Sequence, residues 1–169
     1  MNRSTAWGAM VVASAFAVAP LAAAQAAWST YANTEYHVRV DTPAAPSVAI
    51  KIVHRDDGDS PTLSGSLAYG QSAMIFTVSD LSHTGVANNA QAALDQAVAG
   101  ASRNRTVDSV TPITVDGAPG RLIVAHNDAA SLKARIFFSG NRLYAAMAGA
   151  PLGQEPAEFD RFARSMHAL

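Results

Sequence analysis

The chain has 169 residues, with 12 Lys and Arg against 13 Asp and Glu, so its formal net charge is −1 at pH 7. This balance argues against a nucleic-acid-binding protein, because such proteins carry a basic stripe that neutralises phosphates. Cysteine is absent, which excludes disulfides, a lipoprotein attachment thiol and thiolate metal ligands.

Residues 1–26 have the pattern of a secretory signal peptide. A basic residue near the start precedes a short apolar run at 6–19, which small residues follow. The run is shorter than the roughly 20 apolar residues that a membrane-spanning helix needs. We expect cleavage after Ala24 or Ala26, and a mature chain, 27–169, that is periplasmic or secreted and has no membrane span.

The next four runs alternate apolar and polar residues, which is typical of strands with one buried face. In the second run Ile50 and Ile52 share a face with Val48, and we expect this face to point inward. The polar segment 55–61 is expected to be a hairpin loop. The four predicted strands form a meander and comprise residues 36–40, 47–54, 63–69 and 74–78.

The apolar period then changes to that of a helix over residues 89–103. Asn88 is the expected N-cap, and Gln91 follows three residues later as in a capping box. The apolar stripe is mostly alanine, so the helix can sit close to the sheet that it covers. A gap beneath Leu94 and Val98 would indicate a small-ligand carrier.

Strands are expected again after the helix. The first two are separated by a DGAPG turn and comprise residues 107–115 and 121–126. The following segment is a predicted hairpin whose two-residue loop, Gly140-Asn141, suits a type II′ turn because glycine comes first. This register pairs Phe137 with Tyr144 on a mixed face, and it gives the other face only apolar residues.

The C-terminal segment 155–169 is a predicted helix with Pro156 at its first position. Its apolar stripe must be buried, whereas Trp28–Thr34 shows no pattern and is expected to be a loose segment. Together these elements predict one α+β domain over residues 27–169. Its fold is an antiparallel sheet of seven or eight strands covered by a middle helix and a C-terminal helix.

Motifs for catalysis are not found. The five histidines lack metal-ligand spacing, and the acidic segment 56–59 lacks the ligand ladder of a calcium loop. We therefore expect a non-enzymatic protein without a cofactor. The alternative is a small hydrolase or metal-dependent enzyme that uses His54, His126 and nearby aspartates, because histidine is the usual general base and metal ligand.

Several segments together resemble the PsbP/Mog1-like group, especially its small exported bacterial members. The resemblance extends over residues 35–168 and rests on "YHVRVDTPAAP", "AMIFTVSDL", "DGAPGR", "ARIFFSGNRLYAAMAGAP" and "FDRFARSM". It implies an antiparallel sheet sandwiched by helices. It also implies a binding or assembly role, since relatives act in photosystem II or on a small GTPase, but no motif for either partner is present.

The leading hypothesis is an exported accessory protein of the cell envelope that acts through protein–protein contact. Arg121 and Arg142 are expected to pair with Asp116 or Asp128, or to present a small anion-binding face. If Phe137 and Tyr144 are exposed, this aromatic pair is the first candidate for the partner-binding surface. The sequence predicts neither the partner nor the oligomeric state. The candidate partner-binding face comprises Arg121, Phe137, Arg142 and Tyr144.

Overall fold

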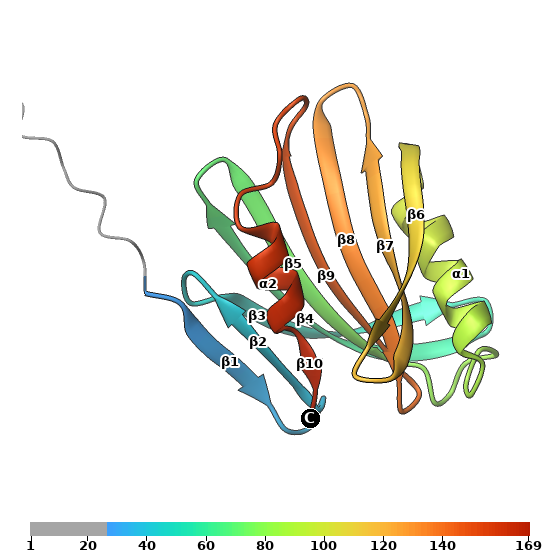
Figure 1. Cartoon of the computed structure of the whole chain (residues 1–169). Helices are drawn as coiled ribbons and strands as arrows, with labels where there is room; N and C mark the ends of the chain where they lie inside the picture. Colours follow the sequence, from blue (N-terminus) through green and yellow to red (C-terminus); the bar gives the residue numbers. More distant parts are fainter. Residues whose placement is uncertain (1–26) are drawn as a thin grey trace, which may run out of the picture.

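A seven-stranded antiparallel sheet forms the centre of the computed structural model, which describes residues 27–169 (Figure 1). The predicted signal peptide, residues 1–26, lies outside the described residues. In spatial order, the strands of this large sheet are β3 (Ser47–Arg55), β4 (Gly58–Tyr69), β5 (Ser72–Asp80), β9 (Arg142–Pro151), β8 (Ala130–Ser139), β7 (Ala118–His126) and β6 (Thr106–Val115).

A second, smaller sheet has three strands. In spatial order they are β1 (Ser29–Asn33), β2 (Val38–Thr42) and β10 (His167–Ala168). The expectation of a loose segment at Trp28–Thr34 was therefore wrong, because β1 pairs with β2 over its whole length. Tertiary contacts hold this short strand: the Arg161 guanidinium lies 4.2 Å from the Trp28 ring centroid, and Tyr31 packs on Phe76.

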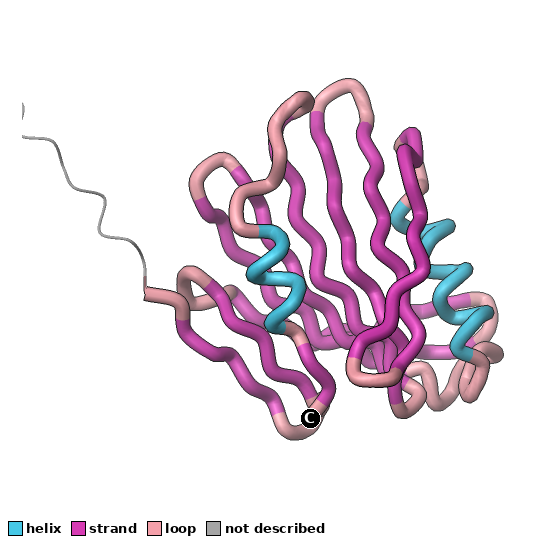
Figure 2. The backbone as a smooth tube through the Cα atoms, viewed as in Figure 1, coloured by secondary structure: helices cyan, strands magenta, loops and turns pink. Residues whose placement is uncertain are grey.

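Both faces of the large sheet are covered, one by a helix alone and the other by a helix together with the small sheet (Figure 2). Helix α1 (Ala90–Ala101) lies on one face, and helix α2 (Phe159–Ser165) lies on the other beside the small sheet. One core, between the large sheet, α2 and the small sheet, contains Phe76, Phe137, Tyr144 and Phe162. The second, under α1, contains Leu94 and Ile123 among others. The predicted α+β fold is confirmed.

The hairpin of β8 and β9 has the predicted register, with Phe137 opposite Tyr144. Its turn differs from the prediction: Gly140 has φ +56° and Asn141 has φ +60°. Positive φ at both central residues is the signature of a type I′ turn, not II′. Asn141 adopts this conformation readily, and its side-chain oxygen also accepts a hydrogen bond from the Asn88 N–H at 2.9 Å.

The expected loop over residues 55–61 is mostly strand, because only Asp56 and Asp57 form the turn and β4 begins at Gly58. Its polar composition concealed a buried position: Ser60 is 1% exposed, and its carbonyl oxygen accepts a hydrogen bond from the Thr62 hydroxyl at 3.2 Å. Gly58 has φ +135°, and a Cβ there would come within 2.1 Å of the His83 carbonyl oxygen, in the loop after β5. The tight turn therefore requires glycine.

Helix α1 begins one residue later than predicted. Asn89, not Asn88, is its N-cap, and the Asn89 side chain accepts a hydrogen bond from the Ala92 N–H at 3.1 Å. Asn88 instead has φ +60° and lies in the preceding turn. Gln91 contributes no capping box, because its amide bonds Asp95 at 2.8 Å.

The predicted C-terminal helix over residues 155–169 is much shorter in the structure, at seven residues. It starts after Glu158, which has φ +56°, and Met166 is already extended. The reason is a competing partner, since β10 continues the small sheet by pairing with β2. The Ser165 hydroxyl stabilises this exit by accepting a hydrogen bond from the Asp41 N–H at 2.9 Å.

Candidate functional site

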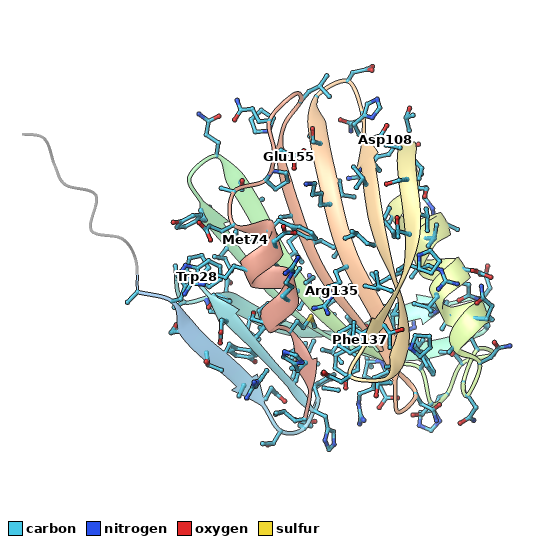
Figure 3. The ribbon with its side chains drawn as sticks, viewed as in Figure 1. Trp28, Met74, Asp108, Arg135, Phe137 and Glu155 are labelled. Atoms are coloured by element: carbon cyan, nitrogen blue, oxygen red, sulfur yellow. The ribbon has the colours of Figure 1, made fainter. Side chains whose placement is uncertain are left out.

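The aromatic pair of the candidate face is part of the core. Phe137, labelled in Figure 3, is 2% exposed and Tyr144 is 1% exposed. Their rings stack with centroids 4.6 Å apart. The Tyr144 hydroxyl donates a hydrogen bond to the His37 carbonyl oxygen at 3.2 Å, which ties β9 to the small sheet. Burial raises the pKa of Tyr144. The prediction that these two residues belong to an exposed contact face was therefore wrong, because the small sheet and α2 cover them.

The two arginines of the candidate face lie on opposite faces of the large sheet. Arg142 shares a face with Tyr144 and forms an ion pair with Asp80 at 3.6 Å. Arg121 lies on the α1 face, where its guanidinium donates to the Gln91 side chain at 3.0 Å. The expected ion pairs with Asp116 or Asp128 are not made. The four candidate residues therefore do not form one surface.

The histidines of the enzyme hypothesis lie on separate hairpins. His54 contacts Asp59 at 2.8 Å, and His126 contacts Asp108 at 3.0 Å. Each pair is solvent-accessible, and among residues 27–169 no three His, Cys, Asp or Glu side chains lie close enough to hold a metal ion. The structure does not bring His54 and His126 into one ligand set or one acid–base pair.

Strand β3 is an edge of the large sheet, and its apolar row is open to solvent. Val48, Ile50 and Ile52 are 40%, 55% and 58% exposed, so their expected inward orientation was only half right. They do lie on the face of the large sheet that α2 and the small sheet cover, because Ile50 is opposite the fully buried Leu63 of that core. However, neither α2 nor the small sheet extends over them. Alternation alone does not reveal whether a face is covered, so sequence reasoning missed this exposed row.

The two edges of the large sheet differ in how they are protected. Strand β6, at one edge, has a register shift between Val107 and Ser109 and contains Pro112. A bulge and a proline both hinder the addition of another strand. Strand β3, at the other edge, pairs with β4 without interruption over nine residue pairs and has no proline. Its outer side therefore offers a long and regular row of backbone groups.

A groove of about 450 Å³ lies between α1 and the large sheet. The groove does not lie beneath Leu94 and Val98, where a gap would have indicated a small-ligand carrier: Leu94 is fully buried, and the helix lines the groove from Ala97 onward. Its walls are apolar except for Thr77 and Arg105. Sequence reasoning did not single out Arg105; its place just after an alanine-rich helix end was the available signal.

Comparisons with known proteins show the fold. No model of a protein family matches the chain, and no curated protein is similar to it in sequence. Among solved structures it is similar to the solution structure of cyanobacterial PsbP (CyanoP) from Synechocystis sp. PCC 6803, with a TM-score of 0.55 and 13% sequence identity. The alignment covers 85% of this chain and 94% of that chain. The chain thus has a PsbP-like fold. No helix among residues 27–169 is both long and apolar enough to cross a membrane.

Proposed function

We propose that this chain is an exported, non-enzymatic binding or accessory protein of the PsbP/Mog1-like kind that acts through protein–protein contact at the β3 edge. One observation carries the proposal: β3 is a regular nine-residue edge strand with three large apolar side chains exposed on one face. An edge strand leaves alternate backbone N–H and C=O groups free, and an added strand can pair with them.

The chemistry of β3 indicates what kind of segment would pair with it. An extended partner segment would place apolar side chains next to Ile50 and Ile52 on one face of the sheet. On the other face, the partner's intervening side chain would lie next to Lys51. Lys51 is exposed and forms no ion pair among residues 27–169. An acidic side chain in the partner would therefore complement it.

A second copy of the chain fits this edge less well. Lys51 is the middle residue of Ser47–Arg55, so full-length antiparallel pairing of two β3 strands would place Lys51 opposite Lys51. Like charges directly opposite each other destabilise a strand pair. The same lysine thus discourages self-association and favours an acidic partner.

The proposal predicts that single changes on β3 abolish partner binding without unfolding the protein. Ile50→Lys should retain the wild-type free energy of unfolding within about 0.5 kcal/mol, because the side chain is exposed. It should lose proteins that the wild type captures after chemical cross-linking in intact cells. Val110→Lys, on the protected β6 edge, is the matched control and should capture the same proteins as the wild type.

Two further outcomes would decide the matter. Lys51→Glu should weaken capture, because it reverses the charge that the acidic partner meets. If Ile50→Lys and Val110→Lys capture the same proteins in the same amounts as the wild type, the β3 edge is not the binding surface.

A further inference from the structure

The groove beside α1 exists because the helix covers only part of its sheet face. Helix α1 packs against β7 and β8, at the side of the large sheet away from β5 (Figure 1). On β5 and β9 the same face remains open, where Ile75 is 36% exposed opposite Met147. Because these two side chains form the floor, the groove retains apolar surface that the fold itself does not bury.

Small residues on the helix keep the groove open. The C-terminal half of α1 lines it with Ala97, Gly100 and Ala101, and the sheet contributes Ala134 and Gly149. A larger side chain at any of these positions would extend into the space. The volume of about 450 Å³ falls in the range of roughly 300–1,000 Å³ that is typical of small-molecule sites.

The polar groups of the groove restrict what it can bind. Thr77 and Arg105 carry its only polar side chains. A peptide backbone would leave most of its N–H and C=O groups without partners here, and such groups are costly to desolvate. A hydrocarbon chain has no such groups and suits the apolar floor.

Arg105 supplies the one charge of the lining. Its guanidinium makes a single long hydrogen bond, 3.3 Å to the Ala101 carbonyl oxygen, and forms no ion pair within residues 27–169. The remaining guanidinium donors are therefore open to an anion, and a carboxylate matches their planar geometry.

We propose that the groove binds a single-chain fatty carboxylate, with the hydrocarbon chain over Ile75 and Met147 and the carboxylate at Arg105. This site is independent of the proposed protein contact. Its floor lies on the α1 face of the large sheet, whereas the exposed row of β3 lies on the opposite face, so either proposal can fail alone.

The test is calorimetric titration of the purified protein with dodecanoate below its micelle concentration. Dodecyltrimethylammonium, with the same chain and a positive head, is the ligand control. The wild type should bind dodecanoate in a saturable one-to-one complex, and it should bind the cation at least about tenfold more weakly, because a charge-assisted pair is worth about this factor.

Three variants locate the site. Arg105→Gln should weaken dodecanoate binding about tenfold and leave binding of the cationic amphiphile no weaker. Arg103→Gln is the matched control, since this exposed arginine lies outside the groove. This variant should bind dodecanoate as tightly as the wild type does. Ala97→Phe should fill the groove and abolish binding, with circular dichroism to show that the variant is folded.

Each contrary result would overturn the proposal. These results are no saturable binding of dodecanoate to the wild type, equal affinity for the cationic amphiphile, or unchanged binding in Arg105→Gln. A folded Ala97→Phe variant that still binds would also overturn it. If that variant does not fold, the two arginine variants still decide the outcome.

Discussion

The stacked pair of Phe137 and Tyr144 stabilises the packing of the small sheet on the large one. Both rings are buried, so Phe137→Ala should lower the free energy of unfolding by about 3–5 kcal/mol, as measured by urea denaturation. Ile52→Ala is the control and should change stability by less than about 0.5 kcal/mol, because Ile52 is 58% exposed. Equal losses in both variants would contradict the assignment of Phe137 to the core.

The Tyr144 hydroxyl gives a finer residue-scale prediction. It donates a hydrogen bond to the His37 carbonyl oxygen at 3.2 Å, and this bond connects the large sheet to the turn between β1 and β2. Tyr144→Phe should retain the stacked ring and lose only this bond, at a cost of about 1 kcal/mol. Tyr69→Phe, at a half-buried tyrosine at the end of β4, serves as the control in the same denaturation experiment.

Asp80 makes stability depend on pH. Burial raises the pKa of Asp80, but hydrogen bonds from Ser82 and the positive charges of Arg142 and His83 outweigh it, so the pKa lies below its ordinary value of 3.8. A depressed folded pKa contributes stability that is present above the unfolded pKa and is lost as pH falls through the folded pKa.

Replacement of this carboxylate should therefore flatten the acid limb of the stability curve. Between pH 7 and about pH 3, Asp80→Asn should lose less stability than the wild type, with chemical denaturation at each pH as the measurement. Asp128→Asn, at an exposed loop position, is the control. If Asp80→Asn has the same acid slope as the wild type, the ionised Asp80 does not stabilise the folded state.

At the scale of elements, β4 depends on a glycine beneath an aromatic ring. Gly65 is opposite Phe76 on β5, and a Cβ at Gly65 would lie 2.2 Å from ring carbons of Phe76. Gly65→Ala should therefore force the buried ring to move and cost about 1–3 kcal/mol. Gly149→Ala is the control, since its Cβ would meet only ordinary contact at 3.5 Å. Similar melting temperatures for the two variants would contradict this packing.

The hairpin elements could be predicted from sequence because their information is local. Gly140-Asn141 and the alternation around it determined the β8–β9 register, and every predicted pair of that hairpin is found. The length of α2 was not predictable in the same way. Its apolar stripe continues through Met166, and only the distant strand β2, by pairing with β10, ends the helix early.

The same distinction between local and non-local information explains what was missed at the candidate sites. Pairing of Phe137 with Tyr144 was predictable, but their cover, the small sheet, depends on β1, whose five residues show no clear period. Likewise, Ile50 and Ile52 alternate as a buried row would. Whether such a row is covered depends on how far α2 and the small sheet extend, which is a tertiary property.

At the scale of the whole molecule, the PsbP-like fold is present at 13% identity to CyanoP. Sheet packing requires apolar alternation and suitable turns, and many sequences supply both, so the likeness shows the fold and leaves function to the surfaces. Among residues 27–169, large apolar side chains are also exposed on β6 and near the C-terminus, but the β3 edge combines such side chains with an unbroken row of backbone groups, and the groove beside α1 combines apolar walls with one charge.

The most direct test of the central claim is site-specific photo-cross-linking in intact cells. A photoreactive amino acid at Ile50 should give a discrete adduct with a partner protein, because that side chain would lie against the added strand. The same residue at Val110, which is 40% exposed on the β6 edge, should give none. Adducts at neither position, or the same adducts at both, would contradict the claim that β3 is the binding edge of this protein.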